Sequence, residues 1–237
     1  MALLGRLLRG VRAGAHRGPL ARSGFDAPES ITVTSPAFTD GGAMPRSSAG
    51  RGVGDNISPP LRWHGPPPET RQLVLVIDDV DVPLPRPLLH TVAVLEPTLD
   101  GVDAGGLRPG AAGIRFVRAD LGHRGYAGPR PIPGHGPHQY RFHVFAIDKP
   151  IPDNVTTAKA LLAAMAGPRA GPRRAHRHVR AGRVMTTARA VDLSRECGVG
   201  QTQHPLFAVA QVLTHHRFRV QRVAALDRFG HGEVVHD

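Results

Sequence analysis

Short apolar runs bounded by glycine, proline or polar turns recur along the first two thirds of the chain. The clearest covers residues 140–147, where Tyr140, Phe142, Val144 and Ala146 alternate with the residues of the opposite face. A period of two is typical of a β-strand. We expect further strands at 31–34, 61–63, 72–78, 89–95 and 114–117.

One convincing helical pattern follows the last of these strands. It begins near Thr156, whose hydroxyl can cap the first turn, and it places Leu161, Leu162 and Met165 on one face. Turn-rich segments separate the strands, and the chain contains 23 prolines. Many short strands and one late helix predict a mainly β fold, an antiparallel β-sandwich with peripheral helices.

Residues 1–30 have the pattern of a basic amphipathic helix followed by a linker that contains glycine and proline. The helix would separate an apolar face of Leu3, Leu4, Leu7, Leu8 and Val11 from a basic face of Arg6, Arg9 and Arg12. Such a helix can lie on a membrane surface, bind a partner or pack on its own domain. The arginines leave no apolar stretch long enough for a secretory signal or a membrane span, and the single Cys197 cannot form an internal disulfide. We therefore expect a cytoplasmic protein.

The formal net charge of +11 would ordinarily suggest a nucleic-acid partner. Its distribution argues otherwise, because residues 168–237 hold 12 arginines and 5 acids, whereas residues 1–167 hold 18 basic and 14 acidic side chains. The basicity belongs mostly to the tail. A basic nucleic-acid-binding protein that acts through the C-terminal tail is therefore an alternative rather than the main expectation.

Polar residues gather at the ends of the expected strands, where binding sites are usually built. They are Asp79 and Asp81, His90, Tyr126 and Gly128 of a Gly-Tyr-Ala-Gly-Pro turn, and His138 and Tyr140. Residues two apart on a strand point to the same side, so the two acids share a face if the strand continues through them. Two acids and two histidines around a Gly-Pro turn can together enclose an anion.

Each of these groups has a role in an anion site and also an ordinary structural interpretation. A histidine can donate to a phosphate oxygen, and the amide of Gly128 can add a hydrogen bond because no side chain obstructs its approach. A carboxylate can hold a neighbouring histidine protonated, or accept from the ammonium of an ethanolamine-like head group. Alternatively, the acids cap backbone amides at a strand end and the histidines are core residues. Only the joint pattern favours a site.

A series of motifs carries a resemblance to a known family. They are Ser-Pro-Ala-Phe at 35–38, Asp-Asn-Ile-Ser-Pro-Pro-Leu-Arg-Trp at 55–63, Asp-Val-Asp-Val-Pro at 79–83, the turn at 125–129 and His-Gln-Tyr-Arg-Phe at 138–142. In this order they resemble the phosphatidylethanolamine-binding protein (PEBP) family, in its bacterial Raf-kinase-inhibitor-like branch of the YbhB/YbcL type. The resemblance covers about residues 31–167, which we take as the domain.

The resemblance implies a small anion pocket lined by the motif residues, with no metal or other cofactor. Carried over one by one, the ligand-binding residues are Asp79, Asp81, His90, Tyr126, Gly128, His138 and Tyr140. The resemblance also implies a cis peptide bond between Val82 and Pro83. The family usually flanks the first histidine with tryptophans, whereas this chain has Leu88 and Thr91, so the pocket wall has less aromatic surface and the ligand can differ in size.

Two alternatives to a binding protein use the same side chains. Two carboxylates and two imidazoles could hold a divalent metal, but their spacing follows no helical or hairpin metal pattern. A hydrolase could use His90 or His138 as its base, but no Gly-x-Ser-x-Gly motif is present and Cys197 lies outside the domain. We therefore expect a binding protein for a small anion or phosphorylated head group, and not an enzyme.

The residues after Gly167 depart from the family's ending. Family members continue in a form like Gly-His-Val-Leu-Ala-Arg-Gly-Glu-Leu-Thr-Gly-Thr-Tyr-Glu-Arg, whereas residues 167–181 read Gly-Pro-Arg-Ala-Gly-Pro-Arg-Arg-Ala-His-Arg-His-Val-Arg-Ala. A single C inserted into GC-rich codons for the first sequence yields the second. We therefore interpret 168–237 as an out-of-frame tail without a native fold, which would leave the sandwich without its closing helix and strand. An arginine-rich, disordered extension is the alternative.

Overall fold

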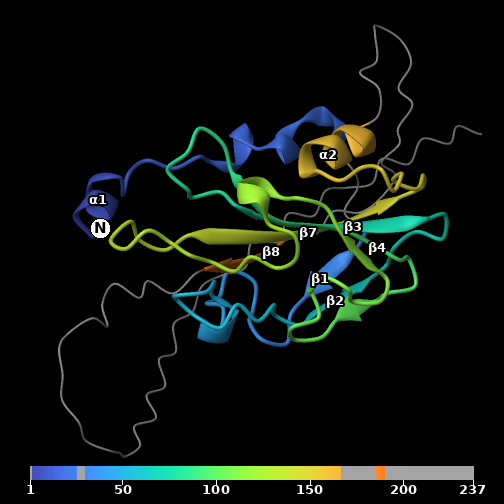
Figure 1. Cartoon of the computed structure of the whole chain (residues 1–237), viewed down its shortest axis with the longest axis horizontal. Coiled ribbons are helices and arrows are strands. Elements are labelled where there is room, and N and C mark those ends of the chain that lie inside the picture. Colours follow the sequence, from blue (N-terminus) through green and yellow to red (C-terminus); the bar gives the residue numbers. More distant parts are fainter. Residues whose placement is uncertain (1, 26–29, 167–184, 190–237) are drawn as a thin grey trace, which may run out of the picture. The chain divides into compact units, whose positions relative to one another are not determined.

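The computed structural model describes residues 2–25, 30–166 and 185–189 (Figure 1). All of them belong to one compact unit, residues 1–198, and the second unit, residues 199–237, lies outside the described part of the chain. No helix among the described residues is long and apolar enough to cross a membrane.

Two antiparallel sheets form the framework of the described unit. The larger has the strand order β6-β4-β3-β7-β8 and the smaller the order β1-β2-β5. The strands are β1 (Thr32–Thr34), β2 (Leu61–His64), β3 (Gln72–Asp79), β4 (Leu88–Leu95), β5 (Gly101–Val102), β6 (Ile114–Phe116), β7 (Gln139–Ile147) and β8 (Met185–Arg189). The mainly β, antiparallel fold predicted from the pattern is confirmed.

The central strand β3 is covered on both faces, which explains why its sequence is almost continuously apolar. Leu73, Leu75 and Ile77 pack toward the smaller sheet in a cluster that includes Trp63 and Phe142. The alternate residues, Val74 and Val76, pack in a second cluster with the apolar face of helix α2 (Ala158–Ala166). Figure 1 shows α2 on one side of β3 and β7, and β1 and β2 on the other.

The N-terminal segment differs from the expected helix and linker. Helix α1 covers only Ala2–Leu7, and its leucines are largely exposed, since Leu3, Leu4 and Leu7 are 72%, 52% and 75% exposed. The helix instead packs through Gly5, where a Cβ would collide with the carbonyl oxygen of Pro133. The helix thus packs on its own domain through Gly5, while its leucines stay largely exposed.

The expected linker contains three short 3-10 helices, η1 (Ala15–Arg17), η2 (Pro19–Ala21) and η3 (Ser23–Phe25). Leu20 and Phe25 are buried in the cluster beneath α2, so this part of the chain contributes to the core. Two further 3-10 helices, η4 (Arg46–Ser48) and η5 (Asp120–Gly122), lie in the loops around the large sheet.

Strand β8 corrects part of the interpretation of the tail. It pairs antiparallel with β7 over five residue pairs, from Gln139 with Arg189 to His143 with Met185. An edge strand such as β7 offers unpaired backbone groups, and a backbone ladder requires no particular side chains. The prediction that no strand follows residue 168 in the sandwich is therefore wrong. The frame change and the absence of a native fold concern residues outside the described part of the chain.

Candidate functional site

A β-bulge gives His90 its position. Strands β3 and β4 pair residue for residue as far as Ile77 with Thr91, after which Asp78 pairs with Leu89 and His90 is left without a cross-strand partner. Bulges bend a strand and redirect its side chains, and they are common beside functional sites. On the other side of β3, Asp79 lies directly opposite Tyr140 of β7. The pairings of β3 with β4 and with β7 therefore place Asp79, Tyr140 and His90 at neighbouring strand ends.

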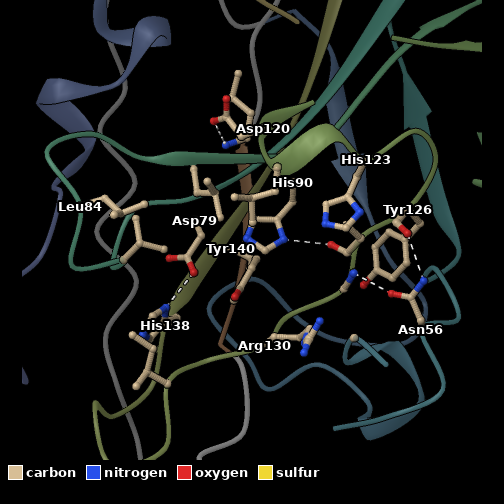
Figure 2. A pocket seen from close by; sticks show the side chains of 18 of the residues that line it. Asn56, Asp79, Leu84, His90, Asp120, His123, Tyr126, Arg130, His138 and Tyr140 are labelled. Carbon is tan, nitrogen blue, oxygen red and sulfur yellow. Dashed lines mark hydrogen bonds and ion pairs between the residues drawn. The ribbon is translucent and has the colours of Figure 1, made fainter. Parts of the chain in front are cut away.

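The strand ends border a cavity of about 500 Å³ (Figure 2). Six of the seven site residues expected from the sequence line it, namely Asp79, His90, Tyr126, Gly128, His138 and Tyr140. The apolar part of its wall includes Val82, Pro83, Leu84, Leu88, Leu89, Leu121 and Ile132. The sequence motifs therefore do converge on one pocket, in which polar groups face an apolar wall.

Asp81 is the exception. Strand β3 ends at Asp79, so the condition for the two acids to share a face is not met. The carboxylate of Asp81 accepts a hydrogen bond from the amide of Gln139 at 2.7 Å and pairs with Arg12 at 2.9 Å. Asp81 does not line the cavity, and its inclusion among the site residues is not supported by this geometry.

The carboxylate of Asp79 is buried, and each of its two oxygens has a hydrogen-bond partner. One oxygen lies 2.7 Å from Nδ1 of His138, and the other accepts the amide proton of Asp81 at 2.8 Å. Asp79 and His138 are each only 1% exposed. Burial raises the pKa of Tyr140 well above its usual range, and the charge of Asp79 and a hydrogen bond to its carboxylate add to this shift. Tyr140 therefore stays protonated and serves as a donor.

His90 lines the pocket, and one of its ring nitrogens has no hydrogen-bond partner. Its Nδ1 donates to the carbonyl oxygen of Ala127 at 3.0 Å, and its ring contacts Tyr140 edge to face at 5.0 Å (Figure 2). Its Nε2 is buried and has no hydrogen-bond partner. Burial lowers the pKa of His90 below its ordinary value of 6.5, so the ring is neutral and Nε2 carries a lone pair.

The side chain of Asn56 holds the turn at 125–129 in place. Its side chain donates to the carbonyl oxygen of Tyr126 at 3.1 Å and accepts the amide proton of Gly128 at 2.8 Å (Figure 2). The amide of Ala127 donates to the hydroxyl of Thr91 at 3.2 Å. The amide of Gly128 is thus already engaged, and the expectation that it donates to an anion is wrong.

Comparison with known proteins now adds the family. A family model described as phosphatidylethanolamine-binding protein matches residues 34–175. The chain belongs to the phosphatidylethanolamine-binding protein family. A UPF0098 protein from Methanothermobacter thermautotrophicus is 36% identical over 117 residues, which cover 47% of this chain and 73% of that protein.

Solved structures agree with this family assignment. The crystal structure of Escherichia coli YbcL, described as a member of the mammalian PEBP family, matches with a TM-score of 0.57 and 25% identity, over 68% of this chain and 98% of that one. The PEBP homologue CT736 from Chlamydia trachomatis matches with a TM-score of 0.56 and 26% identity, over 68% and 97%.

Mycobacterial relatives match over a shorter part of their length. A UPF0098 protein from Mycobacterium tuberculosis is 36% identical over 115 residues, which cover 48% of this chain and 53% of that protein. LppC from the same species, named as a candidate lipoprotein, is 35% identical over 119 residues, with 50% and 56% covered. The chain thus spans about half the length of these relatives.

One expectation taken from the family resemblance does not hold. The described residues contain no cis peptide bond, so the bond between Val82 and Pro83 is trans. The trans form is the more stable isomer of an X-Pro bond.

The two residues that replace the family's tryptophans differ in position. Leu88 lines the pocket, whereas Thr91 is fully buried and supports the turn through Ala127.

Sequence reasoning did not select several residues that line the pocket. Arg130, Arg51 and His123 bring positive charge or ring nitrogens to the cavity, and Arg130 directly follows the Gly-Pro turn, which was the available signal. Asp120 also lines the pocket, but its carboxylate is engaged by Arg86 at 2.8 and 3.0 Å. Although burial opposes it, this pairing holds the pKa of Asp120 below its usual range. In the described part of the chain, no group of three or more His, Cys, Asp or Glu residues is arranged to hold a metal ion.

Proposed function

We propose that this protein is a non-enzymatic binding protein whose pocket takes a small anion or a phosphorylated head group. The observation that carries the proposal is the buried, unpartnered Nε2 of His90, which shares the cavity with the guanidinium of Arg130. A phosphate that carries a proton can donate it to this nitrogen, and an imidazolium there can donate to an anion without one. Arg130 supplies the permanent positive charge that phosphate recognition favours.

The carboxylates support an anion rather than an ammonium group as the ligand. Each carboxylate oxygen of Asp79 and Asp120 already accepts from an internal donor, so neither acid offers a free oxygen to the amine of an ethanolamine-like head group. The pairing of these acids with His138 and Arg86 also reduces their repulsion of an anion. The apolar wall near Leu84 can accept carbon atoms attached to the phosphate.

Calorimetric titration with inorganic phosphate, O-phosphoethanolamine and ethanolamine tests the proposal. We expect the two phosphates to bind and ethanolamine not to bind. His90→Ala and Arg130→Ala should each weaken phosphate binding by roughly tenfold or more, since one charge-assisted hydrogen bond contributes about 1.5–3 kcal/mol. The matched controls are the exposed His64→Ala and Arg108→Ala, which lie outside the cavity and should bind like the wild type. Binding of ethanolamine alone would overturn the proposal.

A hydrolase is the competing function, and the contacts of His138 argue against it. Its Nδ1 faces Asp79 and its Nε2 faces His135 at 2.7 Å, so neither nitrogen is available to take a proton from a substrate or water. Among the described residues, no serine, threonine or cysteine lines the cavity, and the hydroxyl of Tyr126 donates to the carbonyl oxygen of Ser48 at 2.7 Å. We expect no turnover of phosphoesters or acyl esters above background. Turnover that His90→Ala abolishes would favour the hydrolase.

We also propose that residues 1–12 make peripheral contact with an anionic membrane surface. The leucines of α1 are exposed and accompany Arg6 and Arg9, and residues 1–25 contain no acidic side chain. Exposed apolar and basic residues on one short helix favour binding to a membrane interface that is both apolar and negatively charged. Location in the cytoplasm stays a prediction, and so does the weaker alternative of nucleic-acid binding, whose tail lies outside the described residues.

A further inference from the structure

A buried pair of histidines lies behind the wall of the pocket. His135 is fully buried, and His138 is 1% exposed. Their rings meet edge to face at 4.8 Å, with Nδ1 of His135 only 2.7 Å from Nε2 of His138. His135 belongs to none of the sequence motifs and does not line the cavity. Its contact with a residue that does line the cavity raises the question of what it contributes there.

Three hydrogen bonds connect these rings into a chain with two fixed ends. At one end Nδ1 of His138 lies 2.7 Å from Asp79, and at the other Nε2 of His135 lies 3.1 Å from the carbonyl oxygen of Val11. A backbone carbonyl can only accept, so Nε2 of His135 must carry a proton. The short contact between the two rings holds one further proton, which lies on the ring that carries the positive charge. A positive charge is most favourable on His138, because that ring lies directly against the carboxylate of Asp79. Nε2 of His138 therefore donates to Nδ1 of His135.

The contact between His138 and Asp79 requires one more proton, and the surroundings of Asp79 decide where it resides. The carboxylate also accepts the amide proton of Asp81 at 2.8 Å. Donors of this kind stabilise the ionised form of a carboxyl group. The other nearby acid, Asp81, is paired with Arg12 and does not compete. His138 therefore carries both protons and is an imidazolium beside ionised Asp79.

We propose that His135 is a positioning residue that keeps His138 in the imidazolium form and thereby neutralises Asp79 at the wall of the pocket. Without an acceptor at position 135, the Nε2 proton of His138 would be a buried donor without a partner, which is costly. The positive charge on His138 would then be disfavoured, and the negative charge of Asp79 would be left uncompensated beside the ligand. This inference rests on the proposed anion pocket.

The N-terminal segment holds the outer end of this chain in place. The amides of Ala13 and Gly14 donate to the carbonyl oxygens of Val82 and Val80, each at 2.9 Å. Arg12 adds its contact with Asp81 and donates to the carbonyl oxygen of Pro137 at 3.2 Å. Val11 is thereby fixed as the acceptor for His135, so the segment before the domain takes part in setting the charge beside the pocket.

Two neutral substitutions at position 135 separate this role from simple packing. His135→Gln can reproduce both contacts, because its amide oxygen accepts from His138 and its amide nitrogen donates to Val11. His135→Leu keeps the bulk and removes both. The ring nitrogens of His138 are observed in long-range ¹H–¹⁵N spectra of the full chain near neutral pH, and the affinity for inorganic phosphate is measured by calorimetry.

We expect two protonated ring nitrogens on His138 in the wild type and in His135→Gln, and one in His135→Leu. Phosphate affinity should fall by roughly tenfold in His135→Leu and be largely restored in His135→Gln. A neutral His138 in the wild type, or equal phosphate affinity in a folded His135→Leu, overturns the inference. If His135→Leu does not fold, the wild-type and His135→Gln spectra decide. If the wild type binds no phosphate, the proposed function fails, while the spectra still decide the position of the proton.

Discussion

The two nitrogens of His90 define which ligands the pocket can accept. Nδ1 donates to the carbonyl oxygen of Ala127, so only Nε2 is left to bind a ligand. Burial lowers the pKa of the ring below 6.5, so the ring is neutral in the free protein and its Nε2 carries a lone pair. An anion without a proton of its own would meet that lone pair. Its binding must be coupled to the uptake of a proton by His90.

The first prediction follows from this coupling and concerns sulfate, whose charge does not change near neutral pH. A bound anion favours the imidazolium, so the pKa of His90 is higher in the complex than in the free protein. Sulfate affinity should thus rise as pH falls between these two values, by up to about tenfold per pH unit, and be weak above them. Calorimetric titration over this range measures it. A profile that is the same in His90→Gln as in the wild type would contradict the coupling.

Asn56 supports the second prediction at this scale. Its amide satisfies both Tyr126 and Gly128, and its backbone has a φ of 59°, a conformation that asparagine tolerates better than most residues. Asn56→Ala should lower the free energy of unfolding by about 1–3 kcal/mol, because a donor and an acceptor lose their partner. Phosphate binding should weaken too, since the turn at 125–129 borders the pocket. Urea denaturation measures the first effect, and the exposed Asn154→Ala is the control. Unchanged stability would mean that the turn does not depend on Asn56.

The residues that the sequence did not reveal share one physical property. Asn56 binds Gly128, 72 positions away, and His135 binds Val11, 124 positions away, and no local pattern encodes such contacts. The bulge at His90 likewise depends on the register between two strands. By contrast, Asp79, His138 and Tyr140 occupy strand ends, which periodicity can locate. Sequence reasoning therefore found the residues of the pocket but not which of their polar atoms were already engaged.

Elements with a strong period were predicted well, and elements without one were not. The expected strands at 72–78 and 89–95 correspond to β3 and β4 within one residue at each end, because both have apolar residues throughout. Strand β5 has two residues and the helices η1 to η3 have three each, lengths at which no period can be recognised. Tertiary contacts of Leu20 and Phe25 stabilise the latter.

The third prediction concerns α1 as an element. Leu4→Asp combined with Leu7→Asp should abolish sedimentation of the protein with phosphatidylglycerol vesicles, because the apolar residues would no longer enter the interface. Vesicles of phosphatidylcholine alone should bind the wild type weakly, since they lack the charge that attracts Arg6 and Arg9. Ile57→Asp, at an exposed apolar residue elsewhere, is the control. Equal binding of the leucine variant and the wild type would exclude α1 as the contact.

At the scale of the molecule, the two faces of the large sheet form the core, and its strand ends form the pocket. Its apolar residues pack against the small sheet on one face and against α2 on the other, while the pocket lies at the ends of β3, β4 and β7. A rigid central sheet therefore holds the site residues, which is the arrangement that gives a precise binding geometry. Strand β8 extends this sheet beside β7, although its sequence lies in the tail that we had expected to be outside the fold.

The last prediction is the dependence of global stability on pH, to which two buried groups contribute. Burial alone would raise the pKa of Asp78, but hydrogen bonds from His143 and Arg141 outweigh it and hold the pKa below its ordinary value of 3.8. Since this pKa is depressed by folding, the stabilisation is complete above that value and is lost as pH falls through the lower pKa of the folded protein.

His90 acts earlier in an acid titration of the same molecule. Its pKa is lowered by burial, so below the ordinary value of 6.5 the unfolded chain binds a proton that the folded protein does not. The contribution of His90 to the free energy of unfolding should therefore be greatest above about pH 6.5 and decline below it, and the contribution of Asp78 should decline below about pH 3.8. Urea denaturation at a series of pH values measures both steps, and His90→Gln should remove the upper step while leaving the lower one. A His90→Gln variant whose stability follows the same pH profile as the wild type would show that folding does not lower the pKa of His90.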